Sequence, residues 1–151
     1  MSIKLIKLSE HETGSLYSVD DPTNYFRIKF QNIKALFKPD TYNKACYIKW
    51  DVENADLSKI RRFEEMLSSH YSKITKSNIL IRMNYPRMLN TKHNHSKNPL
   101  IIDGSLLSIG NFIAENLEQR YDITLTLGKV FVNNDTIKYP LLINKISISK
   151  I

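Results

Sequence analysis

Two segments of the chain alternate aromatic and cationic side chains with apolar ones. Residues 25–30 read YFRIKF, and residues 46–52 read CYIKWDV. A period of two is typical of β-strands, whose successive side chains point to opposite faces of the sheet. One face of each strand would be apolar, and the other would carry Tyr25, Arg27, Lys29, Tyr47 and Lys49. Rings that stack on bases, beside cations that contact phosphates, are suited to binding single-stranded nucleic acid.

The same composition has a simpler interpretation, because the exposed face of an ordinary antiparallel sheet also favours Tyr, Thr and Lys. Further basic and aromatic side chains flank the two strands and could form the walls of a groove. They are Lys34, Lys38, Tyr42, Arg82, Tyr85, Arg87, Lys92 and Lys97. Several belong to residues 84–98, the longest irregular stretch, which contains no acid. Long loops in compact domains are functional or disordered, so this stretch is either a basic arm over phosphates or a solvated excursion.

The net charge agrees with a polyanionic partner. The 151 residues include 22 Lys and Arg against 15 Asp and Glu, which gives a formal charge of +7 and a pI near 9.4. Such an excess attracts nucleic acid over long distances. Lysine outnumbers arginine by 16 to 6, and isoleucine and asparagine are also abundant. All three have A/T-rich codons, so genome composition is an alternative cause of the charge.

The sequence offers little to support catalysis. His93 and His95 form the one conspicuous metal-ligand pair, but zinc needs three or four ligands and none completes the set nearby. No glycine-rich phosphate loop and no nucleophile motif is present. Asp51, Asp103 and Asp122 lie near expected strand ends and could gather a metal as in a nuclease, although their spacing does not require it. We therefore expect no enzyme, no cofactor and no metal site, and keep a metal-dependent nuclease as a minor alternative.

The elements that would position these residues follow from periodicity and turn signals. In chain order we expect strands at 3–8, 25–37 and 44–52, a helix at 57–74, strands at 79–83 and 99–103, and a closing hairpin of 121–132 and 136–148. Residues 11–22 and 38–43 read as turns. Residues 105–118 fit either a helix or a strand followed by a helix, and this is left open. Gly128 and Pro140 indicate irregularities in the hairpin.

The helix is the clearest element. Residues 54–56 supply an N-cap, and apolar side chains recur at helical spacing from Leu57 to Ile74, with Glu64 on the solvated side. The single cysteine, Cys46, and the single tryptophan, Trp50, fall on the apolar face of their strand and are expected in the core. A catalytic cysteine usually has an electropositive, partly exposed setting.

This order of elements matches an OB-fold, a five-stranded Greek-key barrel often with a helix between its third and fourth strands. The predicted fold class is mainly β with one clear helix, an OB-fold-like barrel extended by a C-terminal hairpin, in a single domain over residues 1–151. No window of 18 apolar residues indicates a transmembrane helix, and the N-terminus shows no signal peptide. We therefore expect an intracellular protein, cytoplasmic or nuclear, with no membrane partner.

Three stretches, YFRIKFQNIKALFKP, ACYIKW and YDITLTLGKVF with YPLLINKISI, carry a resemblance. The chain resembles the small OB-fold single-stranded DNA-binding proteins of bacteriophages and large DNA viruses. The resemblance implies coating of exposed strands in replication, recombination or repair, without sequence preference, at a viral or phage replication site. Many such proteins recruit partners through an acidic C-terminal tail, whereas this sequence ends ISISKI. Recruitment by such a tail is not expected, and self-association would use another surface.

Two hypotheses of different classes remain. The first is a non-enzymatic, sequence-nonspecific single-stranded DNA-binding protein that stacks aromatic rings on bases and contacts phosphates with Lys and Arg. The second is a viral protein-interaction, structural or assembly module without nucleic-acid binding. The sequence does not distinguish DNA from RNA, because contacts to the 2′-hydroxyl leave no readable spacing.

The first hypothesis predicts that Tyr47→Ala and Arg27→Ala each weaken oligonucleotide binding and leave the fold intact, because each removes a stacking or phosphate contact. Fluorescence anisotropy with a labelled oligonucleotide measures the affinity, and circular dichroism checks the fold. Wild-type affinity in both variants would contradict the assignment.

Overall fold

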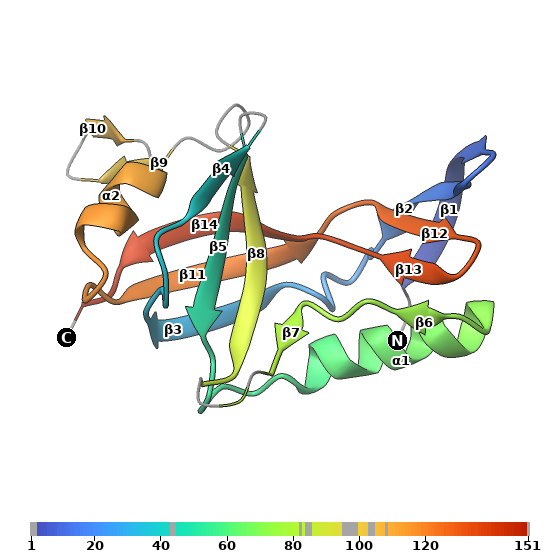
Figure 1. The fold of residues 1–151 in the computed structure, drawn as a ribbon, viewed down its shortest axis with the longest axis horizontal. Helices are drawn as coiled ribbons and strands as arrows, with labels where there is room; N and C mark the ends of the chain where they lie inside the picture. Colours follow the sequence, from blue (N-terminus) through green and yellow to red (C-terminus); the bar gives the residue numbers. More distant parts are fainter. Residues whose placement is uncertain are drawn as a thin grey trace. The chain divides into compact units, whose positions relative to one another are not determined.

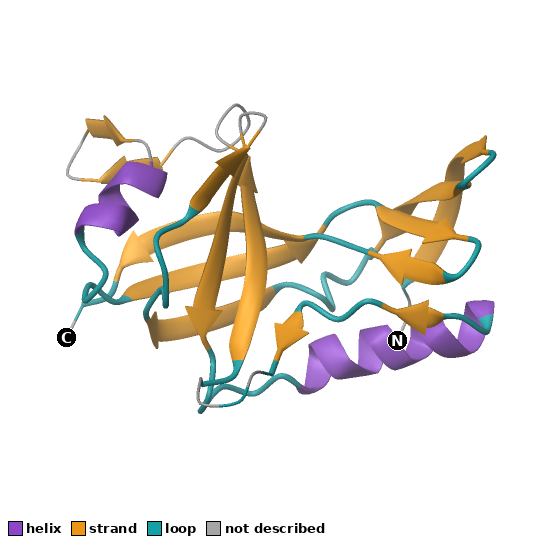
Figure 2. Ribbon diagram, in the orientation of Figure 1, coloured by secondary structure: helices purple, strands orange, loops and turns teal. Residues whose placement is uncertain are grey.

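Strands dominate the computed structural model, which describes residues 3–42, 45–81, 83, 86–94, 100–102, 105–107 and 109–150 (Figures 1 and 2). Contacts divide the chain into two compact units. Unit 1 comprises Met1–Arg27, Asp56–Ser77 and Leu127–Pro140, and unit 2 comprises Ile28–Ala55, Asn78–Thr126 and Leu141–Ile151. The single domain expected from the sequence stays a prediction. Among the described residues, no helix combines the length and apolar character needed to cross a membrane.

Unit 2 contains a mixed sheet that closes into a barrel. Its order in the described residues is β3 (Ile28–Ile33), β11 (Tyr121–Leu127), β14 (Leu141–Ile148), β8 (Met88–Asn94), β5 (Ala45–Asp51) and β4 (Asp40–Tyr42), with β7 (Ile79–Leu80) also paired to β8. The residues after β3 return to β5. Ala35 bridges Trp50, the Leu36 N–H donates to the Lys49 carbonyl at 3.0 Å, and the Asp51 N–H donates to the Lys34 carbonyl at 2.9 Å. The OB-fold-like barrel predicted from the sequence is confirmed.

A chain of hydrogen bonds links Trp50, Thr91 and Ile48 inside the barrel. Trp50 is fully buried, and its indole Nε1–H donates to Thr91 Oγ1 at 2.9 Å. The Thr91 hydroxyl in turn donates to the Ile48 carbonyl at 3.0 Å. The Trp50 ring also lies 5.7 Å from that of Tyr121, in an edge-on arrangement. Both Trp50 and Cys46 are core residues, as predicted.

A short helix covers part of this core. Helix α2 (Ile109–Glu115) follows the two-stranded sheet of β9 (Leu100–Ile102) and β10 (Ser105–Leu107). The alternative left open for residues 105–118 is thereby decided as a strand followed by a helix. A Cβ atom at Gly110 would lie 3.2 Å from Cys46 Sγ, so a glycine in the helix permits its close approach to β5.

Unit 1 contains a second sheet, of order β1 (Lys4–His11), β2 (Gly14–Asp20), β12 (Val130–Asn133), β13 (Thr136–Lys138) and β6 (Ile74–Thr75). The predicted strand at 3–8 is an edge strand, β1. The turn predicted over residues 11–22 is wrong, because most of it is β2. A Cβ at Gly14 would lie 2.4 Å from the Val132 carbonyl oxygen, so this glycine serves close approach of β12 as well as the turn.

Helix α1 (Ser58–Tyr71) confirms the predicted helix with shorter bounds. It ends where Ser72 adopts a left-handed conformation, and Ile74 pairs with Thr136 in β6 instead of continuing the helix. The N-cap residue is Leu57, which has no side-chain cap, while the Asp56 carboxylate accepts the Ser58 N–H at 3.0 Å.

The predicted apolar stripe of α1 is buried at Ile60, Phe63 and Leu67. Glu64, expected on the solvated side, instead accepts hydrogen bonds from the Tyr139 hydroxyl and from Ser77 Oγ. The sequence prediction for Glu64 failed because its principal donor, Tyr139, lies 75 residues away in the closing hairpin.

The closing hairpin is confirmed and is interrupted where predicted. Gly128 lies between β11 and β12, Pro140 lies between β13 and β14, and the Gly128 N–H donates to the Pro140 carbonyl at 3.0 Å. At the tip, Asn133 Oδ1 accepts the N–H groups of Asp135 and Thr136. The hairpin therefore contributes β11 and β14 to the barrel and β12 and β13 to the sheet of unit 1.

Four other sequence predictions need correction. Residues 84–98, expected to be irregular, contain β8, a central strand of the barrel whose inward residues include Thr91 and His93 in place of apolar ones. The strand predicted from residue 25 begins at Ile28, because the Asp21 carboxylate holds residues 25–26 in a turn. Residues 38–43, expected to be a turn, include β4. The strand at 79–83 is reduced to β7.

We predict that Thr91→Val destabilises the protein by about 1–3 kcal/mol, because it leaves the buried Trp50 N–H and Ile48 carbonyl without their partner. Urea denaturation followed by circular dichroism and by the fluorescence of Trp50 measures the change. Thr126→Val, at a half-buried position of β11, is the matched control. Equal stability of the two variants would contradict the role of Thr91.

Candidate nucleic-acid interface

The outer face of β4, β5 and β8 brings together several residues predicted from the sequence. Because Cys46, Ile48 and Trp50 point into the barrel, Tyr47 and Lys49 point outward. Burial of Leu89, Thr91 and His93 likewise leaves Lys92 on the outer side of β8. The three strands lie side by side in Figure 1.

The strand register aligns these side chains in rows. Tyr47 lies directly opposite Asp40 on β4 and Lys92 on β8. The Lys92 ammonium lies 5.9 Å from the centroid of the Tyr47 ring, which is within the range of a cation–π interaction. In the next outward row, Lys49 lies opposite Asn90. A half-buried ring with an ammonium group over it therefore occupies the middle of the face.

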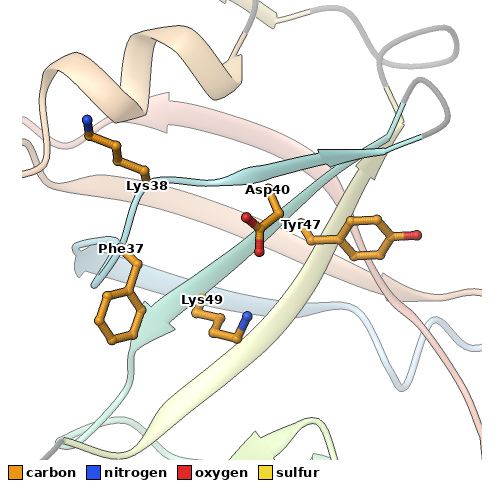
Figure 3. A pocket seen from close by; sticks show the side chains of 5 residues that line it. All are labelled: Phe37, Lys38, Asp40, Tyr47 and Lys49. Carbon is orange, nitrogen blue, oxygen red and sulfur yellow. The ribbon is translucent and has the colours of Figure 1, made fainter.

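A pocket of about 270 Å³ opens beside this row, lined by Phe37, Lys38, Asp40, Tyr47 and Lys49. Figure 3 shows Asp40 and Lys49 between the rings of Phe37 and Tyr47, with the Lys38 ammonium pointing away. Phe37 is 38% exposed, so part of its surface is open to solvent. Two aromatic rings thus flank an opening that also holds the Lys49 ammonium group. We call these five residues together with Lys92 the barrel face.

Phe37 and Asp40 are members of the barrel face that the sequence did not indicate. Alternation with the buried Ala35 would place Phe37 inside the barrel, but a bend at residues 36–37 turns it outward. Asp40 appeared to be a turn residue, whereas it begins β4. A phenylalanine between Lys34 and Lys38, directly before Lys38-Pro39, is the signal that could have suggested the aromatic.

Four other predicted residues of unit 2 lie on β3, on β4, and on the segments at the barrel closure and before β8. Lys29 is exposed on β3, opposite Thr124 of β11, and so is not in the rows of the barrel face. Lys34 is half-buried beside the closure of the barrel. Arg87 precedes β8, and its N–H donates to the Glu53 carboxylate at 2.6 Å. Tyr42 is the last residue of β4.

Tyr25 and Arg27 belong to unit 1, not to the unit that holds the barrel face. Arg82, Tyr85 and Lys97 lie outside the described residues. The structure therefore brings together Lys38, Tyr47, Lys49 and Lys92 from the predicted set, and adds Phe37 and Asp40.

Charge is concentrated on the unit that holds the barrel face. Unit 2 contains 12 Lys and Arg against 7 Asp and Glu, a formal charge of +5, whereas unit 1 contains 10 against 8, a charge of +2. Most of the excess positive charge therefore belongs to the barrel, where it strengthens the attraction of a polyanion to this unit.

In the part of the chain that the structure describes, the aspartates proposed for a nuclease site do not come together. Asp51 accepts the Glu53 N–H, and Asp122 accepts from the Asn32 N–H and the Ser149 hydroxyl, so both carboxylates hold backbone turns or strands together. Asp103 lies outside the described residues. Over those residues no group of three His, Cys, Asp or Glu is placed to hold a metal.

Two further candidates are buried. His93 is 2% exposed and faces into the barrel, so its predicted place in a solvated loop is wrong, and His95 lies outside the described residues. Burial of Cys46 raises the pKa of its thiol to about 11, an effect larger than the opposing hydrogen bond from Thr41. The thiol is therefore protonated near neutral pH, which argues against a nucleophilic role.

Comparison with known proteins identifies the class of fold. No protein-family model matches the sequence, and no curated protein matches it. The structure is similar to that of the single-stranded DNA-binding protein from bacteriophage Enc34, at 15% identity and a TM-score of 0.55, over 98% of this chain and 90% of that one. The chain therefore has the fold of a phage single-stranded DNA-binding protein.

Two other structures of the Enc34 protein show the same likeness over 98% of this chain. A C-terminal truncation matches at 14% identity and a TM-score of 0.54, over 94% of that chain. A complex of the Enc34 protein with single-stranded DNA matches at 13% identity and 0.53, over 96% of that chain. The resemblance noted in the sequence is thus confirmed for the fold.

We predict that Cys46 reacts slowly with a thiol-specific disulfide reagent in the native protein at pH 8 and fast in denaturant. The pKa raised to about 11 leaves little thiolate below that pH, and the barrel excludes the reagent. The absorbance of the released thiol measures the rate. Rapid stoichiometric labelling without denaturant would contradict the buried placement.

Proposed function

We propose that this protein binds single-stranded DNA without sequence preference and without catalysis, through the barrel face. The observation that carries the proposal is the outward row of β5 and β8, in which Tyr47 lies under the Lys92 ammonium and beside a pocket lined by Phe37 and Lys49. The fold shared with the Enc34 protein, one structure of which contains single-stranded DNA, supports the same conclusion.

The barrel face offers groups for both contributions to the affinity, base stacking and phosphate contacts. Stacking of a base on an aromatic ring is worth about 1–3 kcal/mol, and Tyr47 and Phe37 offer two rings. Phosphate contacts by Lys38, Lys49 and Lys92 would release counterions from the strand. Asp40 opposes phosphate locally, which favours a base over a phosphate in the centre of the pocket.

Stacking and phosphate contacts are also the reason why we propose binding without sequence preference. Stacking uses the π-face that every base has, and an ammonium group contacts the phosphates that every nucleotide has. A sequence reader would need donors and acceptors aimed at base edges. Neither ring stacking nor phosphate contact separates DNA from RNA, so the preference for DNA rests on the likeness to the Enc34 protein.

A protein that coats exposed strands in this way would act in replication, recombination or repair inside a cell, including at the replication site of a phage or virus. Such a role needs affinity for single strands over duplex and reversible binding. A strand held by phosphate contacts and stacking satisfies both, because duplex DNA hides its base faces.

We predict that the double variant Lys49→Gln/Lys92→Gln binds single-stranded DNA more weakly and with a shallower salt dependence. For single strands the slope of log K against log salt is about −0.7 per phosphate contact, so loss of two contacts reduces its magnitude by about 1.4. Fluorescence anisotropy of a labelled oligothymidylate across a salt series measures the slope.

Lys145→Gln/Lys150→Gln is the matched control, because both residues are exposed in unit 2 and the change in charge is the same. Equal slopes for the two double variants would overturn the assignment to the barrel face. Duplex DNA and single-stranded RNA in the same series test the partner. Failure of the wild type to bind any of the three at low salt would contradict the proposal and favour a protein-interaction module.

A further inference from the structure

A second cluster of aromatic and cationic side chains lies in unit 1. Its aromatic member, Tyr25, is held in place by its own turn, since the Asp21 carboxylate accepts the N–H groups of Tyr25 at 2.9 Å and of Phe26 at 2.8 Å. Phe26 is 2% exposed, and its ring lies 5.2 Å from that of Phe63 on α1. With Phe26 anchored in the core, the neighbouring Tyr25 ring stays half-buried at the surface of the unit.

Helix α1 supplies cations beside this ring. The Lys59 ammonium lies 5.1 Å from the centroid of the Tyr25 ring and donates to the Tyr25 carbonyl at 3.1 Å. Arg62 follows three residues later, so it lies on the same flank of the helix. Arg27 follows Tyr25 by two residues. These cations are exposed, and within the part of the chain that the structure describes they form no ion pair.

Two acids near this cluster, Asp21 and Asp56, are occupied. Asp21 accepts the two backbone N–H groups of the turn, and Asp56 accepts the Ser58 N–H at 3.0 Å. Hydrogen bonds from Ser58 are the main cause of the lowered pKa of Asp56, and the charges of Arg62 and Lys59 lower it further. Asp56 is thus close to these two cations, yet its carboxylate serves the start of the helix.

We propose that Tyr25, Arg27, Lys59 and Arg62, which we call the Tyr25 patch, form a second contact for the backbone of a bound single strand. The proposal rests on the proposed function and extends it, because the patch belongs to unit 1 and the barrel face to unit 2. A ring with a cation over it and further cations beside it is the chemistry that the barrel face also presents.

Two contact regions on one chain make the affinity depend on the length of the strand. One OB-fold covers about 4–16 nucleotides. A strand of about 8 nucleotides would fill the barrel face alone, whereas a strand of about 30 nucleotides would be long enough to engage both regions. Binding of the second region is then intramolecular and raises the affinity without any change in the first contact.

The test is the double variant Lys59→Gln/Arg62→Gln in the full chain, with labelled oligothymidylates of about 8 and about 30 nucleotides in a salt series. We expect unchanged affinity for the short strand and affinity on the order of tenfold lower for the long one. The salt slope for the long strand should fall in magnitude by about 1.4, for two lost phosphate contacts. Circular dichroism confirms that α1 is intact.

Lys76→Gln/Lys138→Gln is the matched control, because both residues are exposed in unit 1 and the change in charge is the same. The proposed role of the Tyr25 patch would be overturned if Lys59→Gln/Arg62→Gln bound the long strand with wild-type affinity and salt slope. It would also be overturned if the losses equalled those of the control. Either result leaves the proposed function standing if Lys49→Gln/Lys92→Gln still weakens binding of both strands. If neither double variant bound more weakly than the wild type, both the barrel face and the Tyr25 patch would be ruled out as contacts.

Discussion

The hydrogen bonds between residues 34–36 and β5 are the constraint on which the barrel face depends. They close the sheet, so that one side of β5 faces an interior and the other faces solvent. Trp50 fills the interior and hydrogen-bonds to Thr91, which ties β5 to β8 in a single register. A shift of one residue would move Tyr47 inside and Trp50 outside. The outward row is therefore a consequence of how the core is packed.

The packing of the core also fixes the aromatic rings of the barrel face more firmly than its lysines. Stacking on Tyr47 and Phe37 needs rings held in fixed positions, because a mobile ring loses side-chain entropy when it stacks. Tyr47 is half-buried under Lys92, and Phe37 lies in a bend between the barrel closure and β4. Phosphate contacts by flexible lysines tolerate more freedom and weaken with salt. In the proposed complex, the rings would determine where a base lies, and the lysines would bring the strand to them.

The closing hairpin links the two units through the backbone. Strands β11 and β14 complete the barrel, and β12 and β13 complete the sheet of unit 1. The break between them falls at Gly128 and Pro140, because a proline nitrogen cannot donate a hydrogen bond to a neighbouring strand. Tyr139, next to that break, hydrogen-bonds to Glu64 and contacts Phe63. One segment thus stabilises α1, whose exposed flank carries Lys59 and Arg62.

The sequence by itself determined the features that depend on local periodicity. The alternation around Tyr47 and Trp50, the apolar stripe of α1, the closing hairpin and the burial of Cys46 were all predictable, because near neighbours in the chain decide them. Tertiary structure alone decided that residues 88–94 form a central strand, since inward-facing Thr91 and His93 are polar and the partners of Thr91, Trp50 and Ile48, lie more than 40 residues away in the chain. It also turned Phe37 outward through a bend, and placed Tyr25 against Lys59 within unit 1. Each of these depends on contacts between residues far apart in the chain, which periodicity does not encode.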